Sequence, residues 1–159
     1  MKKLAVLLFI ISPLFVFGQE DSNPPNELGA IAVNFEVDED YFPIKTPDGQ
    51  AFYSEDYKAA IMGQLLPISF EQMELEYNTG SLEQGGEVVE KDILTLDGKR
   101  FLFVKMILKD KGDTYLTMYA RQNDDSTSIL VSGFYGPGHD AEKMDAYTKT
   151  AALSAAVKE

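Results

Sequence analysis

The fold is decided by residues 88–135, which read VVEKDILTLDGKRFLFVKMILKDKGDTYLTMYARQNDDSTSILVSGFY. Runs of β-branched, aromatic and aliphatic residues alternate here with short polar turns, a pattern typical of consecutive strands. Asp97-Gly98 is the clearest turn, because aspartate and glycine suit the two positive-φ positions of a type I′ hairpin. The stretch predicts an antiparallel meander of four strands, at Val88–Leu96, Phe101–Leu108, Tyr115–Ala120 and Ile129–Tyr135.

The second of these strands is apolar on both faces, apart from Lys105. A strand with this composition belongs inside a sheet that is covered at least in part on both sides. We therefore expect the middle of the meander to supply much of the core. The residues expected to be buried are Phe101, Phe103, Val104, Ile107, Leu116, Met118, Leu130 and Val131.

A strand and a helix are predicted before the meander. Ile31–Val37 alternates apolar and polar residues, as a half-buried strand does. Glu55–Leu65 has apolar residues at helical spacing, and the hydroxyl of Ser54 before it can accept a hydrogen bond from the first turn. Met73–Tyr77 alternates again and predicts another strand, while a helix fits this segment nearly as well.

A second helix is predicted after the meander. Gly136-Pro137-Gly138 ends the last strand, and Asp140 can cap the helix that follows. One helix face carries Met144, Tyr147, Ala151 and Ala155, whereas Leu153 and Val157 lie nearly opposite, which leaves the buried face of the last turn open. The elements together predict an α+β domain, in which the four-strand C-terminal meander and an N-terminal strand form an antiparallel sheet packed with helices.

Residues 1–18 have the form of a secretory signal peptide. Lys2 and Lys3 are followed by the apolar run Leu4–Phe17, and the small residue Gly18 predicts cleavage before Gln19. The run is shorter than the roughly 20 residues that a membrane-spanning helix needs. We expect a signal peptide at 1–18, a flexible leader at 19–28 and a single α+β domain at 29–159, exported to the periplasm or secreted.

Charge and composition narrow the function. The formal charge of −12 becomes −14 once Lys2 and Lys3 leave with the signal peptide, and such a domain repels nucleic acid and anionic lipid. A cationic ligand, a divalent cation or a basic partner stays compatible with it. The chain has no cysteine, which excludes a cysteine nucleophile, a thiolate metal site and a lipid on an N-terminal cysteine. We therefore expect no stable membrane anchor after cleavage.

The order of elements resembles the PsbP-like family, including its bacterial DcrB-type envelope proteins. The resembling segments are Tyr41–Pro47, the strands at 98–104, 114–119 and 128–135, and the C-terminal helix around Ala151-Ala152-Leu153-Ser154. The resemblance implies an α/β/α sandwich around an antiparallel sheet, and members that mostly bind or assist partners without doing chemistry. Several bacterial members are lipoproteins, and this chain departs from them because it has no cysteine.

Few residues suggest catalysis. His139 is the only histidine and could act as a general base, but it lies in a glycine-proline loop with no recognisable nucleophile motif. Ser132-Gly133 lies inside a strand pattern and indicates a structural role. Tyr115, Tyr119 and Tyr135 could share one face of the sheet, either as ordinary half-buried strand residues or as part of a binding surface.

Acidic residues invite a metal hypothesis. They cluster at Glu36, Asp38, Glu39 and Asp40, at Asp110 and Asp113, and at Asp124 and Asp125. None of these groups has the spacing of a calcium loop with its glycine and terminal glutamate, so solvated turns are the expected interpretation. The sequence predicts no catalytic, cofactor-binding or metal residues.

Two functions follow as hypotheses. The first is a non-catalytic exported domain of the bacterial envelope that binds a protein partner or ligand through a sheet face or a loop. The alternative is a small secreted hydrolase that uses a carboxylate together with His139. The enzyme requires a concave pocket where His139 meets a carboxylate, whereas the binding domain predicts His139 at the surface with no such pocket.

Overall fold

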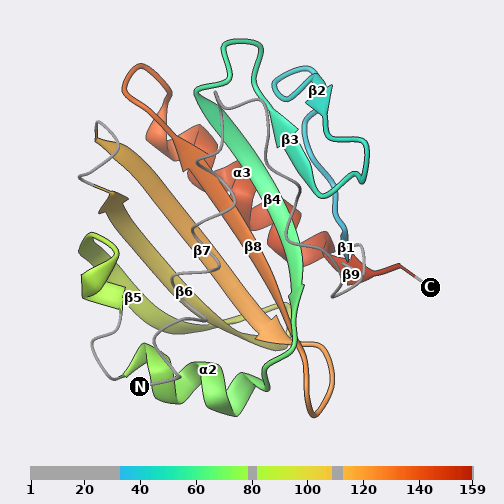
Figure 1. The fold of residues 1–159 in the computed structure, drawn as a ribbon, viewed down its shortest axis with the longest axis vertical. Coiled ribbons are helices and arrows are strands. Elements are labelled where there is room, and N and C mark those ends of the chain that lie inside the picture. The colour runs from blue at the N-terminus through green and yellow to red at the C-terminus, as the bar shows by residue number, and fades with distance from the viewer. Residues whose placement is uncertain (1–32, 79–81, 109–112, 159) are drawn as a thin grey trace, which may run out of the picture.

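The computed structural model describes residues 33–78, 82–108 and 113–158, and an antiparallel sheet forms its centre (Figure 1). Seven strands build the sheet: β2 (Ile44–Lys45), β3 (Ala51–Tyr53), β4 (Ala59–Leu66), β5 (Glu87–Leu96), β6 (Lys99–Leu108), β7 (Thr114–Gln122) and β8 (Ser128–Tyr135). Their order across the sheet is β2-β3-β4-β8-β7-β6-β5, and every neighbouring pair is antiparallel.

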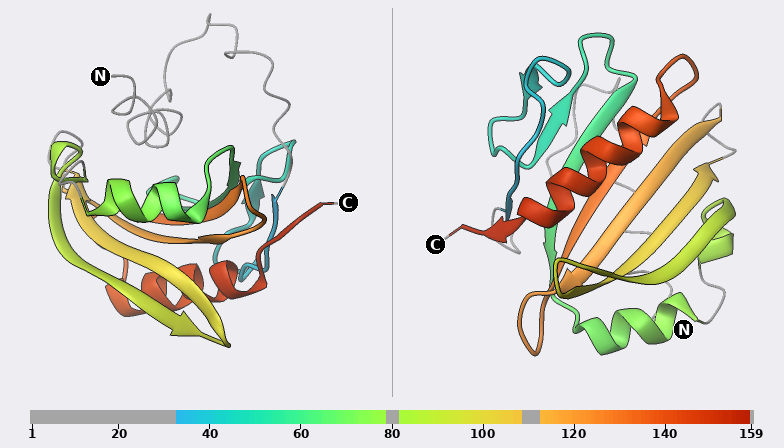
Figure 2. Two further views of the ribbon diagram at one scale, coloured as in Figure 1. Left: turned by 90° about the horizontal axis from the view of Figure 1, so that it is seen from below. Right: turned by 180° about the vertical axis from the view of Figure 1, so that it is seen from behind.

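One α-helix covers each face of this sheet. Helix α2 (Phe70–Tyr77) lies on one face and α3 (Ala141–Ser154) on the other, as the edge-on view in Figure 2 shows. A two-stranded pair, β1 (Val33–Asn34) with β9 (Ala156–Val157), and a short 3₁₀ helix at Leu82–Gln84 complete the described elements. The protein is therefore an α+β domain with an α/β/α arrangement, as the sequence predicted.

The four-strand meander is confirmed. Strands β5, β6, β7 and β8 follow one another along the chain and pair in that order. Asp97 and Gly98, between β5 and β6, have φ angles of 48° and 75°, which are the left-handed values that a type I′ turn requires. The polar turn predicted at 110–113 lies mostly outside the described residues.

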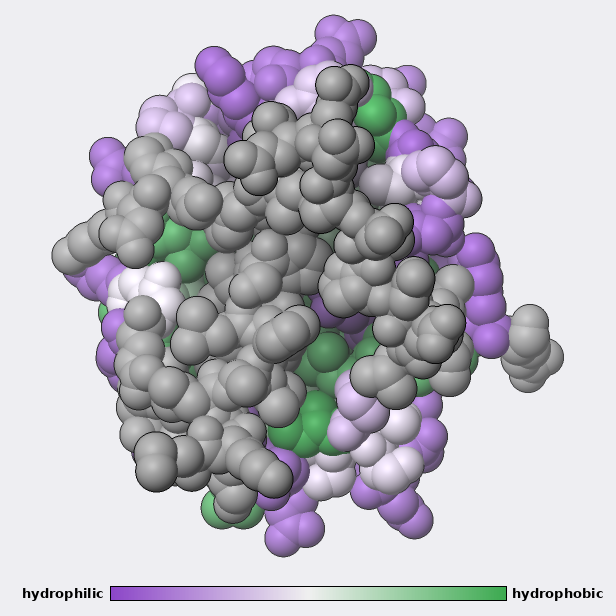
Figure 3. Space-filling view, viewed as in Figure 1, coloured by the Kyte–Doolittle hydropathy of each residue, from purple (hydrophilic) through white to green (hydrophobic). Residues whose placement is uncertain are grey.

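Side chains alternate between two cores, one beneath each helix. Leu102, Val104 and Met106 of β6 pack on the α2 side, while Phe101 and Phe103 pack on the α3 side. Seven of the eight residues expected to be buried are buried, and Ile107 is half-buried because α3 lies over β7 and β8 and leaves this part of β6 uncovered. Seen from the α2 side, hydrophilic residues surround the rim of the molecule (Figure 3).

The prediction of a helix at Glu55–Leu65 is wrong. Residues 54–58 form a turn, in which the hydroxyl of Ser54 donates to Asp56 and the residue Tyr57 has a φ of 56°. The following residues are strand β4, which lies between β3 and β8 and is largely buried on both faces. A strand of this kind is apolar at nearly every position. Its apolar residues therefore fit the spacing of a helix as well as that of a strand, and periodicity does not separate the two.

Two further N-terminal predictions need correction. Met73–Tyr77 belongs to helix α2 and not to a strand, so the alternative of a helix was right for this segment. Ser69 caps that helix by accepting a hydrogen bond from the Gln72 N–H. Of the strand predicted at 31–37, residues 31 and 32 lie outside the described part of the chain. Val33 and Asn34 are paired, and residues 35–37 are not in a strand, although Phe35 and Val37 still pack on the core.

The C-terminal helix is confirmed. Asp140 accepts a hydrogen bond from the Lys143 N–H, and Met144 and Ala151 are buried against the sheet. The helix ends at Ser154, where the chain turns extended into β9, so Leu153 and Val157 both reach the same core. No helix in the described part of the chain is long and apolar enough to cross a membrane. The predicted signal peptide and leader lie outside the described residues.

Candidate functional site

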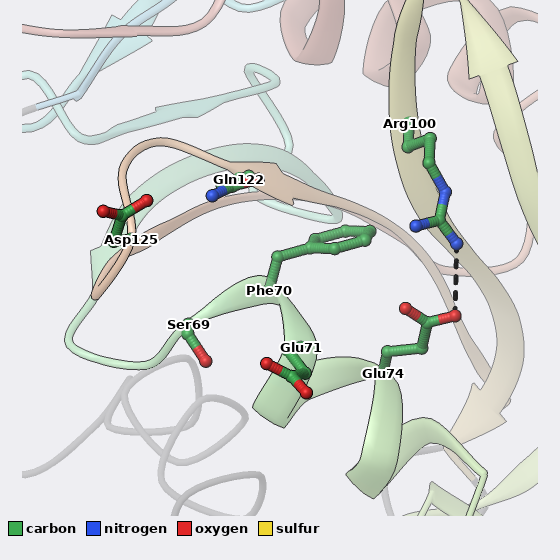
Figure 4. Close-up of a pocket in the computed structure, with 7 residues that line it drawn as sticks. All are labelled: Ser69, Phe70, Glu71, Glu74, Arg100, Gln122 and Asp125. Atoms are coloured by element: carbon green, nitrogen blue, oxygen red, sulfur yellow. Dashed lines mark hydrogen bonds and ion pairs between the residues drawn. The ribbon is translucent and has the colours of Figure 1, made fainter.

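A polar pocket lies between the start of α2 and the β7–β8 turn. Its volume is about 490 Å³, within the range of small-molecule sites. Pro67 and Ser69 end the strand pattern after β4 and start α2, which brings the first turn of the helix beside the ends of β6 and β7. The lining residues come from four elements: Ser69, Phe70, Glu71, Glu74, Arg100, Gln122 and Asp125 (Figure 4).

One ion pair and one aromatic ring form the wall of this pocket nearest β6. Arg100 Nη2 lies 3.1 Å from Glu74 Oε1, and the guanidinium lies 5.5 Å from the centre of the Phe70 ring. Phe70 is buried in the core beneath α2, and the Arg100 guanidinium lies over its ring, so it supports this wall of the pocket from below. Arg100 is more than half exposed, so this cation is accessible from solvent.

The pocket carries more negative than positive charge. Glu71 and Asp125 line it and have no hydrogen-bond or ion-pair partner among the residues that the structure describes. With Glu74 they make three carboxylates against the single guanidinium of Arg100. Within the described ranges, no group of three or more acidic, histidine or cysteine side chains is close enough to hold a metal ion. The charge is therefore spread along the pocket and not gathered at one point.

His139 forms a hydrogen-bonded chain at the other end of the sheet. Its Nδ1 lies 2.7 Å from the Tyr41 hydroxyl, and its Nε2 lies 3.1 Å from Asp56 Oδ2. The three residues belong to the loop before β2, the β3–β4 turn and the loop before α3. The His139 side chain is only 11% exposed, so the prediction of a histidine at the surface is wrong.

The charge of Asp56 fixes the direction of the hydrogen bond at His139 Nε2. Hydrogen bonds from the Ser54 hydroxyl, the Lys58 N–H and His139 lower the pKa of Asp56 to about 2, so it is ionised near neutral pH and can only accept. A neutral His139 then donates through Nε2–H and accepts the Tyr41 O–H at Nδ1. This is the order of groups in a catalytic triad, with a tyrosine in the place of the serine.

The hydrogen-bonded chain of Tyr41, His139 and Asp56 is nevertheless poorly suited to catalysis. Both ring nitrogens of His139 are occupied, so it reaches a substrate only through Tyr41. Burial and the nearby carboxylates of Asp56 and Asp140 raise the pKa of Tyr41, which disfavours the phenolate that a nucleophile would need. The arrangement holds three loops together, and the pocket described above lies at the opposite end of β4.

The acidic clusters form turns. Asp38 accepts hydrogen bonds from the backbone of Asp40 and Tyr41, and Asp124 does so from Ser126 and Thr127. The hydrogen bonds that Asp124 accepts from Ser126 and Thr127 lower its pKa to about 2, and the bond from the Ser126 N–H contributes most. Glu36 and Glu39 are exposed, Asp113 has a φ of 57°, and Asp110 lies outside the described residues.

The three tyrosines share one sheet face, as expected. Tyr115, Tyr119 and Tyr135 all point toward the α3 side, and the rings of Tyr115 and Tyr135 stack at 5.1 Å. Burial, with smaller contributions from Asp145 and Glu90, raises the pKa of Tyr119 to about 12. The three rings belong to the packing between the sheet and helix α3.

A partly buried ion pair on the same face was not predicted from the sequence. Lys105 Nζ lies 2.6 Å from Asp145 Oδ2, and the Thr117 hydroxyl donates to Asp145 Oδ1 over 2.9 Å. The sequence did contain an indication of it, because Lys105 is the one charged residue in the apolar stretch Phe101–Leu108. Gly133 on β8 is structural, as predicted, because a Cβ there would overlap the Thr148 side chain of α3.

Comparison with known proteins adds little. No protein-family profile matches the chain, and no curated protein does. Among solved structures, the solution structure of cyanobacterial PsbP (CyanoP) from Synechocystis sp. PCC 6803 is similar, with 12% identity, a TM-score of 0.49, and coverage of 86% of this chain and 98% of that one. Both the identity and the TM-score are too low to carry an argument about function. The DcrB-type resemblance stays a prediction.

Proposed function

We propose that this chain is a non-catalytic, exported domain of the bacterial cell envelope that binds a small cationic ligand in the pocket beside α2. One observation supports it most: a pocket of about 490 Å³ that is lined by three carboxylates and one guanidinium. The charged start and apolar run of residues 1–18 support export. The high negative charge of the domain adds a field that attracts cations.

The spacing of the carboxylates defines the shape of the ligand. Asp125 lies in the β7–β8 turn, while Glu71 and Glu74 lie on α2, so the charges occupy two walls of the pocket (Figure 4). A single metal ion cannot reach them together. A linear amine with two or more ammonium groups can place one at each wall, with its methylene chain spanning the pocket between them. The ligand class is therefore an organic oligoamine.

Spermidine is a suitable probe, and isothermal titration calorimetry at low ionic strength measures its binding. We expect the double variant Glu71→Gln/Asp125→Asn to bind spermidine about tenfold more weakly, since two charge-assisted contacts are lost. The control Glu55→Gln removes an exposed carboxylate at the opposite end of the sheet and should bind as the parent protein does. The exported chain is used, and its intact mass also shows whether residues 1–18 were removed.

Two results would refute the proposal that the pocket binds an oligoamine. Spermidine could fail to bind at about 1 mM, or the double variant could bind it as tightly as the Glu55→Gln control. In the second case the attraction comes from the overall negative charge, most of which both variants keep, and not from the pocket. Melting temperatures of both variants should match the parent within a few degrees, because the substituted side chains are exposed.

The hydrolase hypothesis rests on one specific observation, the contact of His139 with Asp56. If the Tyr41–His139–Asp56 chain only holds the loops together, His139→Ala should lower the free energy of unfolding by about 1–2 kcal/mol and change no turnover. Urea denaturation and hydrolysis of a nitrophenyl ester measure the two effects. An esterase activity that vanishes in a folded His139→Ala protein would favour the enzyme.

A further inference from the structure

Strand β5 is the outer strand of the sheet along its full ten-residue length. It pairs with β6 on one side, and no strand in the described part of the chain pairs with its other side (Figure 1). The opposite edge of the sheet is β2, which has only two residues. A long open edge presents unpaired backbone groups to which another chain can add as a strand.

The pairing register shows which backbone groups face outward. In a two-residue hairpin, Leu96 and Lys99 flank the Asp97-Gly98 turn and form a hydrogen-bonded pair. Alternation then directs Leu94 toward β6 and leaves the N–H and C=O groups of Lys91, Ile93 and Thr95 pointing outward. The Ile93 N–H donates to its neighbour Asp92 Oδ1 over 2.7 Å, as an outward-facing amide can.

The side chains of β5 select the chemistry of a partner. Val89 is 54% exposed and Ile93 is 36% exposed, and both are among the few large apolar residues at the surface of the described chain. Glu87, Glu90 and Asp92 outnumber Lys91, the single cation of the strand. The Lys91 ammonium is already engaged, 3.6 Å from Glu83 and above the Tyr77 ring.

We propose that an extended, basic segment of a partner protein adds as a strand to the Lys91–Leu96 edge of β5. A second copy of this chain fits less well, because two β5 strands would bring acidic Glu90 and Asp92 of both copies together. Alternating lysine and aliphatic residues in the partner would meet the Asp92 carboxylate on one face of the strand and the exposed Ile93 on the other.

Natural edge strands are often protected against such pairing, and β5 carries two protective features. A bulge between Val88 and Glu90 disturbs the first part of the strand only, so Lys91–Leu96 stays regular. The Asp92 carboxylate accepts the hydrogen bond of the Ile93 N–H, so this amide is not available to a strand that lacks a matching charge. A lysine of a basic partner would attract that carboxylate and free the amide, so the same feature that blocks other strands favours this one.

Proline at Thr95 tests the proposal. The Thr95 N–H faces outward, so proline removes no bond to β6, and edge strands tolerate it. The matched control Thr95→Ala removes the side chain and keeps the N–H. The probe is a fluorescent peptide of about ten residues with alternating lysine and valine, and binding is followed by fluorescence anisotropy. A peptide with glutamate in place of lysine is the charge control.

We expect Thr95→Pro to weaken binding of the basic peptide about tenfold, while Thr95→Ala binds within about twofold of the parent protein. Both variants keep the full charge, so nonspecific attraction is unchanged. Equal binding by Thr95→Pro and Thr95→Ala, equal binding of the acidic peptide, or no binding at about 1 mM would overturn the proposal. So would a loss caused by Glu71→Gln/Asp125→Asn alone, which would assign the peptide to the pocket.

Discussion

Replacing Phe103 with alanine is expected to lower the free energy of unfolding by about 3–5 kcal/mol. The ring is buried on the α3 side of the sheet and packs against Tyr119 at a centroid distance of 5.1 Å. Its removal leaves a cavity in the core on the α3 face of the sheet, where β6 is paired with β5 on one side and β7 on the other. A domain of this size has a total stability of about 5–15 kcal/mol, so the loss is a large share.

Urea denaturation followed by far-UV circular dichroism measures this change. Leu75→Ala is the matched control, because Leu75 lies on α2 with 57% of its surface exposed and its removal should cost less than about 0.5 kcal/mol. If Phe103→Ala unfolds at the same urea concentration as Leu75→Ala, the Phe103 ring is not part of the core on the α3 side of the sheet.

The meander could be predicted from sequence because its signals are local. Asp97-Gly98 fixes one turn by the φ angles that it tolerates, and alternation within each strand fixes which side chains face which core. The same locality explains the predicted cap of α3, since Asp140 and the amide of Lys143 are three residues apart. Interactions of this range depend little on the rest of the chain.

Strand β4 could not be recognised by the same means. Its residues are apolar because both faces are covered, one by each core, and that depends on the remote strand β8. Ala59–Leu66 therefore has no period of its own, and Ser54 and Asp56 before it suit a turn as well as a helix cap. Pairing with β8 decides between strand and helix, and a single sequence does not show that pairing.

Both candidate sites depend on similar long-range pairing. Asp56 and His139 are 83 residues apart, and they meet only because the β3–β4 turn lies beside the loop before α3. Arg100 and Glu74 are 26 residues apart, on a strand and a helix that the sequence reasoning did not place together. The residues could be singled out by type, but their partners could not.

The second large loss of stability is expected at Gly133, where helix α3 packs closely on the sheet. Gly133 lies in the middle of β8, between Thr117 of β7 and Ile61 of β4. Thr148 of α3 lies directly above it, is fully buried, and donates its hydroxyl to the Met144 carbonyl over 2.7 Å. Any side chain at Gly133 must therefore displace Thr148 or push the helix from the sheet.

Gly133→Ala is expected to destabilise the protein by about 1–3 kcal/mol, the usual cost of overpacking a rigid core. Gly136→Ala is the matched control at the end of the same strand, where a new Cβ meets its nearest atom at 3.8 Å and should cost less than about 0.5 kcal/mol. Thermal unfolding of both variants makes the comparison.

A double-mutant cycle with Thr148→Ala identifies the cause. The shorter side chain removes the overlapping hydroxyl, although its Cβ would still lie 3.0 Å from the new methyl group, so the rescue should be partial. We expect Gly133→Ala/Thr148→Ala to be more stable than the sum of the single changes by about 1 kcal/mol. Strict additivity would place the cost in the backbone of β8 and would contradict the close packing of α3 on the sheet at this position.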